Sequence, residues 1–113
     1  MQKKWDVEPV NLIAEQEITE LPHDLQAQFL PISDLLIAFE PQNIREPHIK
    51  HIKGKMWEMR LKGKDCIGRS IYLLSREKKI VILHSFIKKT QKTPRKALQI
   101  AEQRMKEASH DRI

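Results

Sequence analysis

The residues best suited to chemistry in this sequence are cationic and lie on strands predicted in its C-terminal half. Residues 56–62, MWEMRLK, alternate apolar and charged side chains, which predicts a strand with Glu58, Arg60 and Lys62 on one face. Arg69 lies on the next predicted strand, across a short turn. Further lysines follow the third predicted strand, at Lys88, Lys89 and Lys92. We therefore expect adjacent strands to bring guanidinium and ammonium groups to one region.

Cations held on strands are suited to the chemistry of phosphates. Cleavage of RNA by its 2′-hydroxyl needs a base, an acid and fixed positive charge to stabilise the phosphorane, and a guanidinium can grip two phosphate oxygens. Glu58 is a candidate base, and His84 and Tyr72 are candidate proton carriers. The residues alone leave other roles open: Glu58 can pair with Arg60 on the sheet face, and His84 and Tyr72 can be core residues.

Charge is divided unevenly along the 113 residues, which carry a net charge of +6. Residues 1–40 hold two Lys against eight Asp and Glu, net −6, whereas residues 41–113 hold 19 Lys and Arg against seven Asp and Glu, net +12. A basic surface attracts polyanions over a Debye length of roughly 10 Å. The C-terminal half is therefore predicted to face nucleic acid, and its predicted RNA-binding residues are Lys53, Lys55, Lys62, Lys88, Lys92 and Arg95.

Several classes of function leave no signature in this sequence. Cys66 is the single cysteine, so no intrachain disulfide is possible, and His48 and His51 are a weak pair for a metal. There is no phosphate-binding glycine motif, no pattern of a catalytic triad and no helix-turn-helix signal. No apolar run approaches the ~20 residues that span a bilayer, and the N-terminus lacks the apolar core of a signal peptide. We expect a cytoplasmic protein without metal or cofactor.

The length predicts one domain, residues 1–113, of the α+β class. The N-terminal part predicts a short edge strand within residues 3–10, a helix at 11–20 and a second helix that begins at Pro22. Pro31 predicts a kink or break in that helix near residues 28–32. A core stripe is expected along it at Leu25, Phe29, Ile32, Leu36 and Phe39.

The C-terminal part reads as a β-meander followed by a helix. After a polar connection at residues 41–55, strands are predicted at 56–62, 67–75 and 80–87, with the last the most apolar and covered on both faces. Thr93 and Pro94 suit the start of a helix over residues 94–108.

Four stretches of this part resemble the phage-derived RelE-like proteins, a group close to the HigB toxins. They are the EPHIKHIKG lead at 46–54, the WEMR strand at 57–60, the GRSIY strand at 68–72 and the HSFIKKTQKTP segment at 84–94. The KKTQKTP run is the most diagnostic of them. The helical N-terminal part matches the group in pattern only.

The resemblance implies a microbial-RNase-type antiparallel sheet with helices packed on one face. It implies a toxin of a type II toxin–antitoxin system: a metal-independent endoribonuclease, or mRNA interferase, that cleaves mRNA on the ribosome and is neutralised by a helix-turn-helix, HigA-like antitoxin. Carried over by position, the basic site residues of the family match Arg60, Arg69, Lys88 and Lys89. Glu58 shares the face of Arg60, and the predicted catalytic residues are Arg60, Arg69, Glu58 and Lys89. The alternative function is a non-enzymatic RNA- or ribosome-binding protein, which the basic half predicts equally well.

Overall fold

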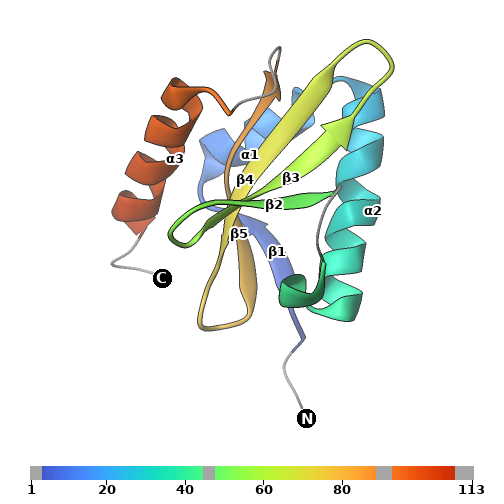
Figure 1. The fold of residues 1–113 in the computed structure, drawn as a ribbon. Helices are drawn as coiled ribbons and strands as arrows, with labels where there is room; N and C mark the ends of the chain where they lie inside the picture. Colours follow the sequence, from blue (N-terminus) through green and yellow to red (C-terminus); the bar gives the residue numbers. More distant parts are fainter. Residues whose placement is uncertain (1–3, 45–47, 89–92, 109–113) are drawn as a thin grey trace.

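A five-stranded sheet with helices packed against it is the frame of the structure (Figure 1). The computed structural model describes residues 4–44, 48–88 and 93–108. The elements in chain order are β1 (Asp6–Pro9), α1 (Leu12–Thr19), α2 (His23–Phe39), the 3₁₀ turn η1 (Pro41–Asn43), β2 (Ile49–Lys53), β3 (Met56–Lys62), β4 (Ile67–Leu74), β5 (Lys79–Lys88) and α3 (Arg95–Ala108).

The sheet has the strand order β1-β5-β4-β3-β2, so β4 is the middle strand. Strands β2 to β5 pair as an antiparallel meander, and β1 joins the far edge parallel to β5. The register places Arg60 directly opposite Arg69 across β3 and β4. The edge strand and the meander that the sequence predicts are thus present. The sheet was expected to be antiparallel, but its β1–β5 pair is parallel.

A β-bulge at Leu83 changes which residues of β5 face which side. Ile71 pairs with His84 but the next residue, Tyr72, pairs with Ile82, so that Leu83 is an additional residue in β5. One extra residue reverses the alternation of side chains beyond it. As a result Lys88, at the end of β5, lies on the same face as Arg69.

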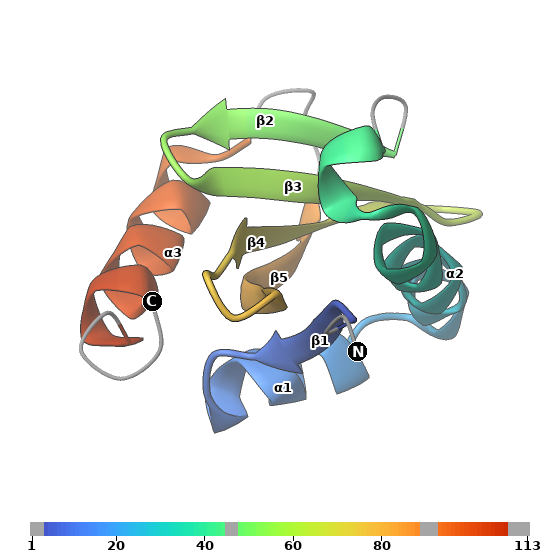
Figure 2. The ribbon, with the colours of Figure 1, turned by 90° about the horizontal axis from the view of Figure 1, so that it is seen from below.

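Helices cover both faces of the sheet, with α2 and α3 on opposite sides (Figure 2). Ile80 and Ile82 belong to the core under α2, whereas Val81 and Leu83 belong to the core under α3. The α+β class is confirmed, but the expectation of helices on one face is wrong. Because consecutive residues of β5 are apolar, both of its faces have to be removed from water.

Strand β2 lies where the sequence predicted only a polar connection. Ile49 is buried, but most of the strand is exposed, and it pairs with β3 on one side only. An edge strand with one buried side chain gives little hydrophobic alternation, so the pattern of residues 49–53 does not predict it.

Helix α2 runs without a break through Pro31, contrary to the expected interruption. Pro31 and Ala27, whose carbonyl loses its partner, are both exposed, so water can solvate that carbonyl. The buried stripe Leu25, Phe29, Ile32 and Leu36 holds the helix on both sides of the proline. Phe39, expected in this stripe, is 60% exposed at the end of the helix.

Glu17 of α1 connects its helix to β5 and to α3. The contacts lie at the part of β5 that extends past its pairing with β1. Its carboxylate accepts hydrogen bonds from both terminal nitrogens of Arg104 of α3, at 2.7 and 2.9 Å, and from the Ser85 backbone at 3.2 Å, and it contacts His84 Nδ1 at 2.9 Å. Arg104 also donates to the Leu83 carbonyl at 2.8 Å. Burial raises the pKa of Glu17, but the bonds from Arg104 and His84 outweigh it and leave the pKa below its usual value.

We expect Glu17→Gln to lower the free energy of unfolding by about 2 kcal/mol near neutral pH, because it leaves Arg104 without its counter-charge. Since the pKa of Glu17 is lowered in the fold, its contribution is present above the usual carboxyl value of 4.5 and disappears as the pH falls through the folded pKa. Urea unfolding at several pH values measures both effects. Glu15→Gln, an exposed change on the same helix, is the control, and an equal loss in both variants at neutral pH would contradict this role.

Candidate active site

Three cations gather around one carboxylate on the face of the sheet that also carries α3. Arg60 of β3 lies opposite Arg69 of β4, Glu58 lies two residues before Arg60, and Lys88 lies opposite Ile67 at the end of β5. We call Arg60, Arg69, Lys88 and Glu58 the cationic cluster. Adjacent strands thus bring these groups together, as the sequence analysis expected.

Glu58 is the counter-charge of the cluster, and it is only 2% exposed. Its Oε1 lies 3.5 Å from Arg69 Nε and 3.9 Å from Arg60 Nε. Its Oε2 accepts a hydrogen bond of 2.7 Å from the hydroxyl of Thr93, just before α3. Both carboxylate oxygens are therefore engaged, so Glu58 is better placed to hold the arginines than to collect a proton from a substrate.

Arg69 is nearly fully buried, at 5% exposed, and one of its terminal nitrogens donates to the Gly68 carbonyl at 2.9 Å. Burial lowers the pKa of its guanidinium, the charge of Glu58 raises it and the charge of Arg60 lowers it. Among the described residues the Nε atoms of Arg69 and Arg60 have no hydrogen-bond partner. The arginines are thus held by charge while part of their bonding capacity is unused, as suits a group that binds an oxyanion.

Lys88 is the buried lysine of the cationic cluster. It is 3% exposed. Burial lowers the pKa of its ammonium group, and the charges of Arg69, Arg60 and Lys50 lower it further against the opposing effect of Glu58. A lysine with a lowered pKa can exchange a proton closer to neutral pH. The sequence analysis assigned Lys88 to RNA binding, and its surroundings in the fold suit proton transfer as well.

The two other candidate proton carriers lie in structural surroundings. Tyr72 is buried in the core under α2, on the opposite face from the cationic cluster, and burial raises the pKa of its phenol. His84 is bound to Glu17 and stacks on Phe86, with ring centroids 5.0 Å apart. The core roles that the sequence left open are therefore the ones that both residues have.

The expected RNA-binding residues are spread over more than one region. Lys62, Lys55 and Arg95 are exposed, and Lys62 follows the cluster along β3. Lys53, in the β2–β3 hairpin at the other end of β3, lies 3.2 Å from Glu102 of α3. Lys92, an expected RNA-binding residue, and Lys89, an expected catalytic residue, fall outside the described part of the chain.

Two residues of this region were not assigned to it by sequence. Lys50 pairs with Glu58 across β2 and β3, and its charge acts on Lys88. Nothing in the sequence placed Lys50 beside Glu58, because β2 itself was not predicted. Thr93 was expected to cap α3, and its position before Pro94 gave no indication that its hydroxyl binds Glu58.

The described residues form neither a metal centre nor a membrane-spanning helix. In ranges 4–44, 48–88 and 93–108, no group of three or more His, Cys, Asp or Glu residues is arranged to bind a metal ion. Within the same part of the chain, none of the helices has the length and apolar character needed to span a bilayer.

The fold and the sequence both have known counterparts. A solved structure with a similar fold is a chain of the archaeal RelE–RelB complex from Pyrococcus horikoshii OT3, with a TM-score of 0.55 and 22% identity over 75% of this chain and 96% of that chain. The fold is therefore RelE-like. A family model described as "Phage derived protein Gp49-like (DUF891)" matches residues 16–106, so the chain belongs to this family, and the phage-derived RelE-like assignment is confirmed. No curated protein matches the sequence.

We expect Lys88→Met to raise the stability of the fold at pH 7 by about 1 kcal/mol, which is about 4 °C in Tm for a chain of this size. The folded pKa of Lys88 lies below the usual 10.5, so the unfolded chain binds more protons and the buried charge costs stability. The gain should shrink as the pH rises toward 10.5, which calorimetry at pH 7 and pH 10 measures.

The matched control is Lys62→Met, which removes an exposed lysine of β3 from the face of the sheet that carries the cationic cluster. We expect it to leave the Tm unchanged. A Lys88→Met chain that melts below the parent at pH 7 would show that the ammonium group stabilises the fold.

Proposed function

We propose that this protein is the toxin of a type II toxin–antitoxin system, and that it cleaves mRNA on the ribosome without a metal ion. The observation that carries the proposal is the cationic cluster: guanidinium groups fixed on paired strands, with a lysine of lowered pKa beside them, on a RelE-like sheet. The toxin domain corresponds to residues 1–113, and it works in the cytoplasm, where it meets ribosomes.

The chemistry is an attack of the RNA 2′-hydroxyl on the adjacent phosphate. The hydroxyl loses its proton to a base, a pentavalent phosphorane forms, and the departing 5′ oxygen receives a proton, which leaves a 2′,3′-cyclic phosphate. Arg60 and Arg69 stabilise the charge that builds on the phosphorane oxygens. Lys88 transfers a proton, and Lys89, which follows it, contributes a further charge. Glu58 fixes the arginines and Thr93 fixes Glu58.

The partners of this reaction follow from the charge and from the solved relative. The C-terminal half, with its net charge of +12, suits RNA, and exposed Lys62 extends the basic surface beyond the cluster along β3. Lys55 and Arg95 are further exposed cations of this half. The relative from Pyrococcus horikoshii was solved as a complex of RelE with RelB. By analogy we assign this chain a cognate antitoxin, of the helix-turn-helix, HigA-like type that the sequence resemblance implies.

The test of the catalytic assignment is Arg69→Ala. Because Arg69 is fixed on the middle strand, its loss should cost about 3–4 kcal/mol of transition-state stabilisation, or on the order of 100- to 1000-fold in rate. Arg69→Lys keeps the charge without the planar fork and should recover only part of the activity. Cleavage of mRNA in a cell-free translation reaction measures the rate, and thermal melting controls for the fold.

An Arg69→Ala chain that melts like the parent and cleaves ribosome-bound mRNA at the parent rate would remove Arg69 from the mechanism. A parent chain that binds ribosomes and blocks translation while the mRNA stays intact would favour the alternative function, a non-enzymatic ribosome-binding protein.

A further inference from the structure

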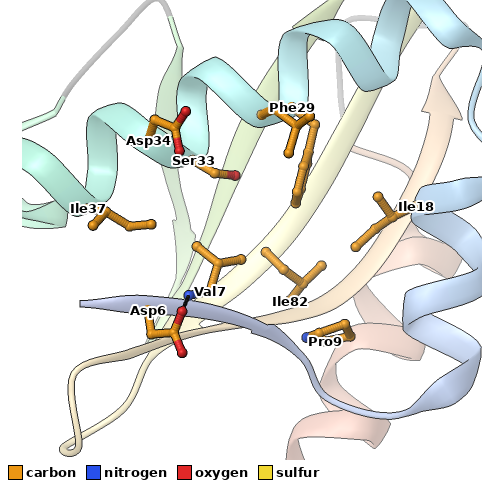
Figure 3. A pocket seen from close by; sticks show the side chains of 10 residues that line it. Asp6, Val7, Pro9, Ile18, Phe29, Ser33, Asp34, Ile37 and Ile82 are labelled. Atoms are coloured by element: carbon orange, nitrogen blue, oxygen red, sulfur yellow. Dashed lines mark hydrogen bonds between the residues drawn. The ribbon is translucent and has the colours of Figure 1, made fainter. Parts of the chain in front are cut away.

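A pocket of about 310 Å³ lies between β1, α1 and α2, away from the cationic cluster (Figure 3). Phe29 and Ile82, two of its lining residues, belong to the core under α2, so the pocket is on the opposite face of the sheet from Arg60 and Arg69. Its walls are mostly apolar and include Val7, Ile18, Phe29, Ile37 and Ile82.

One buried polar group in the pocket lacks a partner. Ser33 of α2 lines the pocket and is 4% exposed, and among the described residues its Oγ has no hydrogen-bond partner. A serine within a helix can bond the carbonyl four residues earlier, and this one does not. Figure 3 shows its hydroxyl between Asp34 and Phe29, on the side of α2 that faces the pocket. A buried hydroxyl without a partner costs free energy.

The rim of the pocket combines negative charge with exposed apolar surface. Asp6 and Asp34 line it, with Asp6 Oδ2 lying 3.7 Å from Lys79 Nζ, and Leu30, also in the lining, is 65% exposed. Nearly all of the lining comes from the N-terminal residues 1–40, the part of the sequence with a net charge of −6. An occupant that matches this surface has an apolar side chain for the pocket and basic groups beside it.

The neighbouring edge of the sheet is not arranged to accept another strand. Asp6 and Val10 donate their backbone N–H groups to β5, so the outward-facing positions of β1 are Val7 and Pro9. The N–H of Val7 is bound by the Asp6 carboxylate at 3.0 Å, and Pro9 has no N–H. With its outward donors blocked, β1 disfavours strand addition. A helix, which satisfies its own backbone, is the better occupant.

We propose that this pocket is the docking site for the antitoxin, and that it receives an amphipathic helix with a basic polar face. An apolar side chain of that helix enters the pocket, and its Lys or Arg residues face Asp34. The identity of the partner rests on the proposed function, whereas the chemistry of the helix rests on the pocket. A partner bound here leaves the cationic cluster open, so it neutralises the toxin by its bulk, which keeps the toxin off the ribosome.

The test uses two designed helical peptides of about 18 residues, or five turns. Both carry Leu and Ile along one face, and the other face carries Lys in the first peptide and Glu in the second. Titrated into the isotope-labelled full chain, the Lys peptide should shift the NMR signals of residues that line the pocket. The Glu peptide should bind at least about tenfold more weakly because it meets the acidic rim.

Variants of the chain separate this site from other surfaces. Leu30→Asp and Asp34→Lys should each weaken the Lys peptide about tenfold or more, and both residues are exposed, so the fold should be kept. Leu12→Asp, which changes a 76% exposed leucine of α1 outside the pocket lining, is the matched control and should bind like the parent. Equal binding by the Lys and Glu peptides, or unchanged binding by Leu30→Asp and Asp34→Lys, would overturn the proposal.

Inhibition of cell-free translation by the same chains keeps the two proposals apart. Leu30→Asp should inhibit translation like the parent, because the pocket is remote from the cationic cluster. If the parent chain does not inhibit translation but the Lys peptide binds the pocket, the docking site stands and the toxin function fails.

Discussion

The buried carboxylate of Glu58 is the constraint on which the candidate active site depends. Arg69 and Lys88 are buried, so burial penalises both of their charges, and the neighbouring charge of Arg60 repels them. Glu58 lies within 4 Å of both arginines and offsets part of this cost. Its other oxygen is bound by Thr93, so the start of α3 is joined to the same group. The side chain of Glu58 on β3 therefore contacts both β4 and the start of α3.

Two surfaces of opposite charge follow from this arrangement. The face with α3 carries the cationic cluster, which suits RNA, and the face with α2 carries an apolar pocket with an acidic rim, which suits a basic protein segment. Glu17, His84 and Arg104 meet at the part of β5 that extends past its pairing with β1, and they join α1 and α3 to the sheet. The sheet thus allows one surface to be occupied while the other stays accessible, which is the basis of the proposed inhibition by bulk.

The sequence predicted the fold well where apolar residues alternate clearly, as in residues 56–62, and where both faces of a strand are apolar, as in residues 80–87. It placed Glu58, Arg60 and Lys62 on one face because the period of a strand is two residues, and it placed Arg69 in the same part of the sheet because its strand follows across a short turn. It could not predict the bulge at Leu83, because one additional residue leaves no mark in an apolar run, and the bulge is what brings Lys88 to the cluster. It also missed β2, a mostly exposed edge strand, and with it Lys50. The bond from Thr93 to Glu58 joins residues 35 apart and depends on tertiary packing.

The reaction that we assign to the cationic cluster is cleavage of ribosome-bound mRNA by attack of the RNA's 2′-hydroxyl on the adjacent phosphate. The most direct measurement is the chemistry of the RNA ends after the purified protein acts on ribosomes programmed with one mRNA, compared with the same mRNA free in solution. We expect one fragment to end in a 2′,3′-cyclic phosphate and the next to begin with a 5′-hydroxyl, and both to form only when ribosomes are present. Fragments with a 3′-hydroxyl and a 5′-phosphate, or intact mRNA on protein-bound ribosomes, would contradict it.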